Sequence, residues 1–303
     1  MGKIAFVFAG QGAQKVGMGL DLFENYRVAR DLFEMLGEKQ KKLLCEGPAE
    51  ELNITINTQP CLFVLDLACA LLLEKHGVKA DASAGFSLGE IPALAFCGLM
   101  SVKDAFELVN RRAEAMQKAA VENPGTMFAV LKLQPETVGE ICDEVGGAFA
   151  VNYNCPGQTV VACRQGYEKQ LESLVLSKGG RVMKLSVSGG FHSPMMTTAA
   201  QVLSDYLSDI AISDMRIPLW SNVTGEPYDP ADARTLIARQ VVSPVLWQRS
   251  IESMMSAGID TFIEVGPGGV LSGLIRRISP DAKIYNVYDR ASLEATVKEL
   301  IYA

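Results

Sequence analysis

A glycine-serine motif constrains the fold of this 303-residue chain more than any other feature of the sequence. Residues 85–89 read GFSLG, and they lie between the apolar run 78–84 and the helix-like segment 88–96. In such a pattern a buried strand turns sharply into a helix, and glycines allow the turn to be tight. The turn exposes the hydroxyl of Ser87 for nucleophilic attack. Loops also collect glycine and serine for turn geometry alone, so the motif needs support from the rest of the chain.

The distribution of apolar residues predicts an α/β fold. Through residue 120, short apolar runs alternate with helical patterns, as expected of βα units on a parallel sheet. The run 4–9 is too short for a signal peptide and is interpreted as the first buried strand. Pro60 suits the first turn of a largely buried helix over residues 61–73. Ser101 with Asp104 suits the N-terminal cap of a further helix.

A second, smaller unit is predicted after the breaker cluster Asn123-Pro124-Gly125. The order of elements there becomes βαββαβ, which is the ferredoxin-like unit. The expected strands are 126–133, 148–153, 159–163 and 181–187, and the expected helices are 135–145 and 166–178. After Gly190 the helix and strand alternation resumes, with strands at 217–222, 261–265 and 283–287. We therefore predict a hydrolase-like α/β domain with a parallel sheet, residues 1–123 and 191–303, carrying a ferredoxin-like insertion at 124–190.

Composition narrows the classes of partner. The formal net charge is −7 and no basic run occurs, which argues against binding to nucleic acid. Seven cysteines form no C-x-x-C pair, and with two histidines they offer little to a zinc or iron site. Apolar residues make up 49% of the chain, but no apolar run approaches the length of a membrane span. We expect a protein of the reducing cytoplasm, with no membrane association, no metal and no permanently bound cofactor.

A serine nucleophile needs a base within hydrogen-bond reach, normally a histidine. His76 follows the charged helix end Glu74-Lys75, a setting typical of a solvated residue at a helix C-terminus. His192 lies in the segment 189–194, which reads GGFHSP and falls where the two units should meet. Taken alone, His192 could equally be a core or capping histidine. Together with Ser87 it becomes the preferred base.

Acyl transfer also needs N–H donors for the oxygen that becomes negative. The backbone N–H of Leu88 directly follows the nucleophile, and the segment 10–14, GQGAQ, follows the first strand and can reach the same sheet edge. An ordinary glycine turn is the alternative for that segment, and no Gly-Lys-Ser/Thr ending supports a phosphate loop. Arg111 and Arg112 are adjacent on one helix, so only one of them can readily face a pocket.

Together these motifs resemble the malonyl-CoA:acyl carrier protein transacylases and the related acyltransferases of fatty-acid and polyketide synthesis. The resemblance covers essentially all 303 residues, and the family's hydrolase-like domain with a ferredoxin-like insertion agrees with the element order above. The motifs that carry it are Gly10–Gln14, Thr58–Pro60, Gly85–Glu90, Arg112 with Met116-Gln117, Phe191–Ser193, Ser221–Gly225 and Glu264–Gly268.

The resemblance implies roles for particular residues. Ser87 would be the acylated nucleophile, His192 the general base and acid, and Arg112 the partner of the malonyl carboxylate. A planar guanidinium can hold a carboxylate through two parallel hydrogen bonds, which gives the role of Arg112 an independent physical reason.

Five further residues complete the implied site. The backbone N–H groups of Gln11 and Leu88 would form the oxyanion hole, and the main-chain carbonyl of Gln240 would orient the histidine. Met116 belongs to the substrate-binding set. The bulky ring of Phe191 would leave little room for an α-methyl group, which favours malonyl over methylmalonyl.

The implied reaction transfers a malonyl group from malonyl-CoA to the phosphopantetheine thiol of acyl carrier protein, with ping-pong kinetics, in a monomeric enzyme of fatty-acid synthesis. A trans-acting polyketide acyltransferase, a serine thioesterase or hydrolase, and a nonenzymatic carrier-binding module are the alternatives. Hydrolases usually place their histidine near the C-terminus, whereas this chain has none after His192. Candidate residues for docking the acidic carrier protein are Lys178, Arg181, Lys184, Arg276 and Arg277.

The chain departs from the family pattern at three positions. Phe86 replaces the usual histidine before the nucleophile, Ala113 replaces a usual glycine, and Pro92 falls early in the helix after the serine. None of these changes removes a proposed catalytic atom, but Phe86 removes a polar contact from the pocket.

Overall fold

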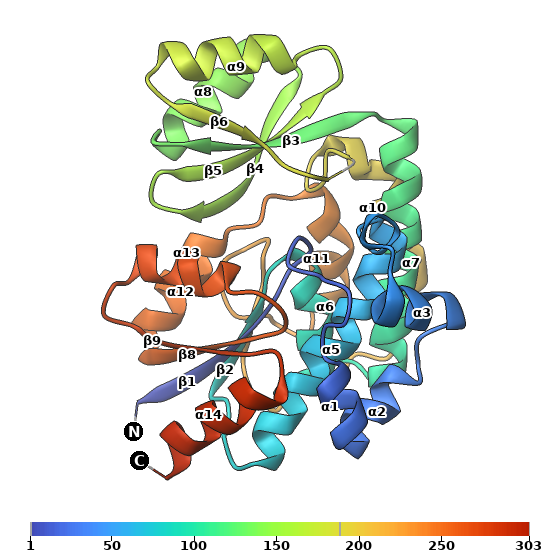
Figure 1. The fold of residues 1–303 in the computed structure, drawn as a ribbon. Coiled ribbons are helices and arrows are strands. Elements are labelled where there is room, and N and C mark those ends of the chain that lie inside the picture. Colours follow the sequence, from blue (N-terminus) through green and yellow to red (C-terminus); the bar gives the residue numbers. More distant parts are fainter. Residues whose placement is uncertain (1, 188, 303) are drawn as a thin grey trace.

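The computed structural model describes residues 2–187 and 189–302, which form two units, one above the other in Figure 1. The large unit contains a five-stranded parallel sheet, and the small unit contains a four-stranded antiparallel sheet. In spatial order the parallel sheet consists of β7 (Leu219–Trp220), β2 (Ala82–Gly85), β1 (Lys3–Phe8), β8 (Ile259–Val265) and β9 (Lys283–Val287). The second sheet consists of β4 (Ala148–Cys155), β5 (Gln158–Arg164), β3 (Gly125–Leu131) and β6 (Arg181–Lys184). The predicted fold class is thereby confirmed.

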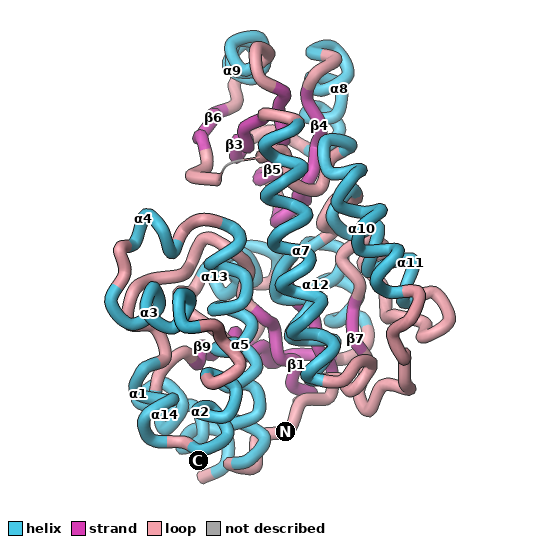
Figure 2. The backbone as a smooth tube through the Cα atoms, turned by 90° about the vertical axis from the view of Figure 1, so that its right-hand side faces the viewer, coloured by secondary structure: helices cyan, strands magenta, loops and turns pink. Residues whose placement is uncertain are grey.

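The helices join and cover these sheets (Figure 2). The α-helices are α1 (Leu20–Asn25), α2 (Arg27–Phe33), α3 (Glu38–Glu46), α4 (Ala49–Leu52), α5 (Thr55–Lys75), α6 (Glu90–Phe96), α7 (Val102–Glu122), α8 (Pro135–Val145), α9 (Glu168–Ser177), α10 (Thr197–Leu207), α11 (Ala233–Arg239), α12 (Trp247–Ser256), α13 (Val270–Ile278) and α14 (Arg290–Ile301). Short 3-10 turns occupy Ser87–Gly89, Pro194–Met196 and Gln240–Val242.

Strand β1 shows why the large sheet is buried on both faces. Its side chains alternate between two apolar clusters, because successive residues of a strand point to opposite faces. Phe6 and Phe8 pack in the cluster that contains α5 and α6, whereas Ala5 and Val7 pack in the cluster that contains α12 and α13. Helices therefore cover both faces, and the carboxyl ends of the strands remain free to carry a site.

Helix α5 corrects two sequence predictions. It begins at Thr55 rather than at Pro60, so the proline lies inside the helix. Proline is common in a first turn, which is why the sequence pattern placed the start there. The helix is also long and apolar enough to span a membrane, contrary to the expectation that no such segment exists. Its most apolar window is 89% buried within the chain, so core packing explains its composition.

The small unit follows the predicted βαββαβ order. Strands β3, β4 and β5 and helices α8 and α9 lie within two residues of the expected bounds, while β6 ends at Lys184 rather than at residue 187. Helices α8 and α9 pack on one face of the sheet around a separate core that includes Phe128, Ile141 and Leu171.

The predicted alternation is less complete near the N-terminus. Four short helices, α1 to α4, stand between β1 and α5, in a stretch for which no element was predicted. The chain then returns through β2, α6 and α7, and α7 rises toward the small unit in Figure 2.

Candidate active site

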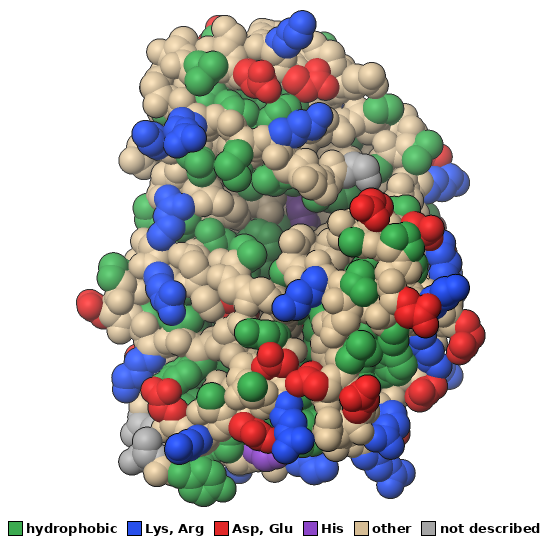
Figure 3. Space-filling model, in the orientation of Figure 1, with side chains coloured by type: hydrophobic (Ala, Val, Ile, Leu, Met, Phe, Trp, Pro, Cys, Tyr) green, Lys and Arg blue, Asp and Glu red, His purple; other side chains and the backbone are tan. Residues whose placement is uncertain are grey.

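A cavity of about 260 Å³ lies between the two units, and Figure 3 shows the hollow that opens on one face of the molecule. Residues from both sheets line it, including Ser87, Arg112 and His192 from the large unit and Asn152 and Asn154 from the small one. The carboxyl ends of β1 and β2 lead into it, which is where ligands bind in open parallel sheets.

The strand-to-helix turn at Ser87 depends on both of its glycines. A Cβ atom on Gly85 would lie 2.1 Å from the backbone of Gly89, and one on Gly89 would lie 2.2 Å from the Phe8 carbonyl oxygen. Side chains at either position would therefore displace the turn from the sheet. Ser87 itself has a φ of 53°, in the left-handed region that few L-residues adopt.

Asn222 lies 135 residues after Ser87 in the sequence and stabilises this turn through two hydrogen bonds. Its Oδ1 accepts a hydrogen bond from the Ser87 backbone N–H at 2.7 Å, and its Nδ2 donates to the Gly85 carbonyl oxygen at 2.6 Å. One buried carboxamide thus bonds both sides of the strained residue and satisfies backbone groups that the turn leaves without ladder partners.

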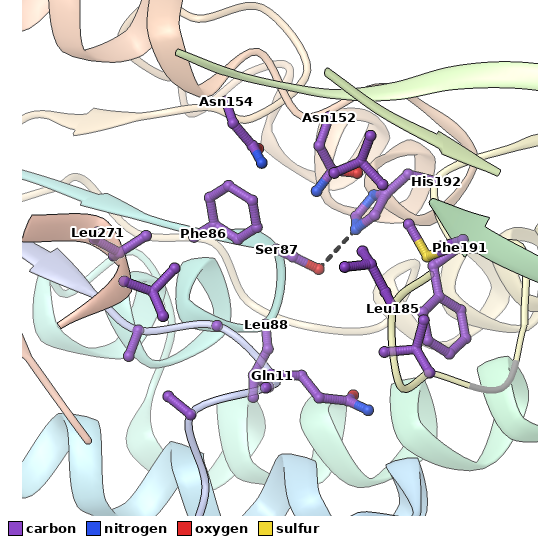
Figure 4. A pocket seen from close by; sticks show the side chains of 18 of the residues that line it. Gln11, Phe86, Ser87, Leu88, Asn152, Asn154, Leu185, Phe191, His192 and Leu271 are labelled. Atoms are coloured by element: carbon purple, nitrogen blue, oxygen red, sulfur yellow. Dashed lines mark hydrogen bonds between the residues drawn. The ribbon is translucent and has the colours of Figure 1, made fainter. Parts of the chain in front are cut away.

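The Ser87 and His192 side chains lie within hydrogen-bond distance of each other. Ser87 Oγ is 2.7 Å from His192 Nε2 (Figure 4). On the other side of the ring, His192 Nδ1 is 2.9 Å from the main-chain oxygen of Gln240. With that carbonyl as acceptor, Nδ1 carries the proton and Nε2 is free to accept one from the serine. His192 is only 3% exposed. Burial and the charge of Arg112 lower the pKa of His192 to about 4, so the imidazole is neutral at pH 7.

Arg112 is the buried member of the arginine pair. Its Nη2 donates to Ser87 Oγ at 3.1 Å and to Gln240 Oε1 at 2.8 Å, and its Nη1 donates to Gln59 Oε1 at 2.9 Å. Burial lowers the pKa of Arg112 to about 10, so the guanidinium keeps its charge at neutral pH. Arg111 points away, pairing with Glu107 and stacking on Tyr206.

The other predicted site residues line the same cavity. Gln11 and Leu88 lie on the loop after β1 and on the serine turn, and Figure 4 shows them beneath the serine. Phe191, next to the histidine in sequence, forms part of the wall together with Met116. Met116 Sδ accepts a weak hydrogen bond from Gln59 Nε2 at 3.7 Å.

Four buried polar side chains near the cavity had no predicted role. Gln59 and Asn222 lie in motifs that carried the resemblance, but a motif does not show which atoms its side chains contact. Asn152 and Asn154 lie on β4 and line the cavity with 6% of each residue exposed, and their Oδ1 atoms have no partner among the described residues. Their spacing of two residues, which places both on one face of a strand, was the available signal.

Of the remaining sequence candidates, Phe86 lines the cavity and His76 does not. His76 is exposed at the end of α5, where its Nδ1 meets the Leu72 carbonyl oxygen at 2.8 Å. Phe86 packs edge-on against Trp247, with 5.4 Å between ring centroids, so the departure from histidine extends an apolar wall. Within residues 2–187 and 189–302, no group of three His, Cys, Asp or Glu side chains is placed to hold a metal ion.

Two docking candidates differ in their surroundings. Arg277 donates to Gln158 Oε1 at 2.8 Å and to the Pro156 carbonyl oxygen at 3.1 Å, so its guanidinium ties α13 to the small unit. Arg276 is exposed on the same helix, as are Lys178, Arg181 and Lys184 on the small unit.

A family model described as the acyl transferase domain matches residues 5–287. The chain belongs to the acyl transferase family. A malonyl CoA-acyl carrier protein transacylase of Bacillus subtilis is 38% identical to this acyl transferase over 310 residues, which cover 99% of this chain and 98% of the relative. The resemblance stated from the sequence motifs is confirmed.

Solved structures agree with this assignment. The malonyl CoA-acyl carrier protein transacylase from Clostridium perfringens superposes with a TM-score of 0.93 at 40% identity, over 98% of this acyl transferase and 97% of that chain. A complex described as a type II PKS acyl-carrier protein with its malonyl-transacylase gives a TM-score of 0.93 at 33% identity, over 98% and 99% of the two chains.

Proposed function

We propose that this acyl transferase moves a malonyl group from malonyl-CoA to the phosphopantetheine thiol of an acyl carrier protein, as the names of its relatives suggest. The single observation that carries the proposal is the buried guanidinium of Arg112, 3.1 Å from the hydroxyl of Ser87. An acyl group on that hydroxyl places its far end beside a fixed cation, so a carboxylated acyl group is favoured. An acetyl group gains nothing from the same cation.

In the first half-reaction, Ser87 Oγ attacks the thioester carbonyl while His192 Nε2 takes the hydroxyl proton. The carbonyl oxygen becomes negative and is stabilised by the backbone N–H groups of Gln11 and Leu88. The carbon–sulfur bond then breaks, and the imidazolium returns its proton to the departing CoA sulfur. The malonyl group remains as an ester on Ser87.

The second half-reaction reverses these roles. The phosphopantetheine thiol gives its proton to His192 and attacks the ester carbonyl, and Ser87 Oγ leaves with the proton from the imidazolium. The Gln240 carbonyl, which accepts from Nδ1, stabilises the charged imidazolium in both halves without changing protonation state. Covalent catalysis of this kind gives ping-pong kinetics.

The small unit supplies the surface for the pantetheine arm that both substrates share. The Oδ1 atoms of Asn152 and Asn154, which have no hydrogen-bond partner within the described part of the chain, are acceptors for its amide N–H groups, because buried acceptors are costly without donors. Leu185 and Val187 line the same cavity and suit the arm's apolar segments. The ring of Phe191 limits the space for an α-methyl group on the acyl chain.

Supply of extender units for fatty-acid synthesis is the pathway that we propose. A polyketide pathway uses the same chemistry, and one solved relative is in complex with a type II PKS acyl-carrier protein. Location in the cytoplasm, a monomeric state and the absence of membrane and nucleic-acid partners stay predictions from the sequence.

Mass spectrometry of the intact protein tests the proposed covalent scheme. After mixing with malonyl-CoA, the wild type should gain one malonyl group, and Ser87→Ala should gain none. Adding holo-acyl carrier protein should then discharge the acyl-enzyme onto the carrier. If water discharges it as fast as the carrier does, the protein is a hydrolase. If no mass is gained on Ser87, the covalent scheme is wrong.

A further inference from the structure

Glu90 is a buried carboxyl group that the proposed reaction does not use. It is the first residue of α6, three positions after the nucleophile, and it is 1% exposed. It does not line the cavity. A carboxyl group at such a depth is costly unless hydrogen bonds compensate for the lost water.

Three donors surround this carboxyl group. Its Oε1 accepts from the Asn222 backbone N–H at 2.9 Å and from the Tyr228 hydroxyl at 2.8 Å. Its Oε2 accepts from Gln240 Nε2. Burial raises the pKa of Glu90 to about 7, while these donors and Arg112 lower it, so Glu90 is mainly ionised at pH 8.

The contact with Glu90 leaves the Gln240 carboxamide only one orientation. Its Nε2 has two hydrogens, and they go to Glu90 and to the Ser87 carbonyl oxygen, the latter at 2.8 Å. Its Oε1 consequently faces Arg112 and accepts from Nη2 at 2.8 Å. A flipped carboxamide would set its single oxygen against two acceptors, Glu90 Oε2 and the Ser87 carbonyl oxygen, and its NH2 group against the Arg112 guanidinium.

We propose that Glu90 is a positioning residue, which fixes the Gln240 carboxamide and through it holds the Arg112 guanidinium ready for a malonyl carboxylate. The proposal rests on the proposed function. The carboxamide separates Glu90 from Arg112, so the cation is held by neutral acceptors, Gln59 and Gln240, and its charge remains for the substrate. A carboxylate bonded to Arg112 directly would compete with the malonyl group.

Glu90→Gln tests the proposal because glutamine keeps the shape of the glutamate side chain and replaces one acceptor oxygen with an NH2 group. An NH2 group at the Oε1 position would face the Asn222 N–H, and at the Oε2 position it would face the Gln240 NH2. In the second arrangement the Gln240 carboxamide flips so that its oxygen accepts from the new NH2 group. Its own NH2 group then faces the Arg112 guanidinium and repels it. At pH 8 we expect kcat/KM for malonyl transfer to fall about 10- to 100-fold, and that for acetyl transfer to fall less than about threefold.

Tyr228→Phe is the matched control. It removes a donor from the other oxygen of the same carboxylate and leaves the Gln240 contact in place, so the malonyl-to-acetyl ratio should change less than about twofold. Gln240→Met removes the carboxamide and keeps Glu90, and it should lower the ratio as Glu90→Gln does. The double variant should lose nothing further, because Glu90 acts only through that carboxamide.

Equal losses for both acyl groups in Glu90→Gln, or no loss, would overturn the proposal and show a general structural role. If Glu90→Gln does not fold, Gln240→Met decides alone, and an unselective loss in that variant overturns the proposal. Failure of the wild type to form a malonyl-enzyme would instead overturn the proposed function, so the two failures are distinguishable.

Discussion

Replacement of Arg112 by glutamine should separate malonyl handling from the acyl-transfer chemistry. Nη1 bonds only Gln59 and keeps one N–H, and Nη2 releases a second when Ser87 Oγ becomes an ester oxygen, so two N–H groups become available to the carboxylate of a bound malonyl group. Charge-assisted hydrogen bonds contribute about 1.5–3 kcal/mol each, so two contribute roughly 3–6 kcal/mol. At about 1.4 kcal/mol per decade, kcat/KM for malonyl-CoA should fall roughly 10²- to 10⁴-fold.

The assay compares release of CoA from malonyl-CoA and acetyl-CoA with holo-acyl carrier protein as acceptor. Acetyl-CoA offers no carboxylate and loses only the hydrogen bond from Arg112 to Ser87 Oγ, so its kcat/KM should fall about 10-fold at most, far less than that of malonyl-CoA. Arg111→Gln is the matched control, because that side chain lies on the outer face of the same helix and pairs with Glu107. Equal losses for both substrates would refute the assignment of Arg112 to the carboxylate.

Two further predictions follow from the cavity wall and from the buried imidazole. Phe191→Ala should raise the methylmalonyl-to-malonyl ratio of kcat/KM by about 10-fold or more, and an unchanged ratio would remove Phe191 from selectivity. With acetyl-CoA as donor, the rate of acylation should fall on acidification near pH 4, where His192 becomes protonated, and an acid limb near pH 6.5 would contradict the buried state. Because the pKa of His192 is depressed on folding, its contribution to stability is present above about pH 6.5 and lost as the pH falls through 4.

The small unit and the Ser87 turn could be predicted because their signals are local. Alternating apolar residues and a proline-glycine break identify the antiparallel sheet of the small unit, and Gly85 and Gly89 fit a turn in which any Cβ would meet backbone. Helices α1 to α4 were missed because they are short, so each contains too few apolar residues to show a clear helical periodicity. Pro60 gave a false start for α5 because proline is more common in a first turn than inside a helix.

The polar contacts around the site could not be predicted from spacing. Asn222 contacts Ser87 across 135 residues, and Gln240 contacts Glu90 across 150. Neither pair shares a helix face or a strand, so no periodic pattern connects them. Only the folded sheet, which brings β7 beside β2, places Asn222 behind the turn.

The positive φ angles at Ser87 and His192 imply that activity and thermal stability oppose each other at these positions. A residue with a side chain costs about 1–2 kcal/mol in that conformation, whereas glycine adopts it freely. Glycine at position 87 would thus relieve conformational energy while abolishing turnover. Selection for thermal stability alone would therefore favour glycine at these positions and remove the catalytic pair. Variants designed for higher stability should keep Ser87 and His192 and carry their substitutions on the outer helices.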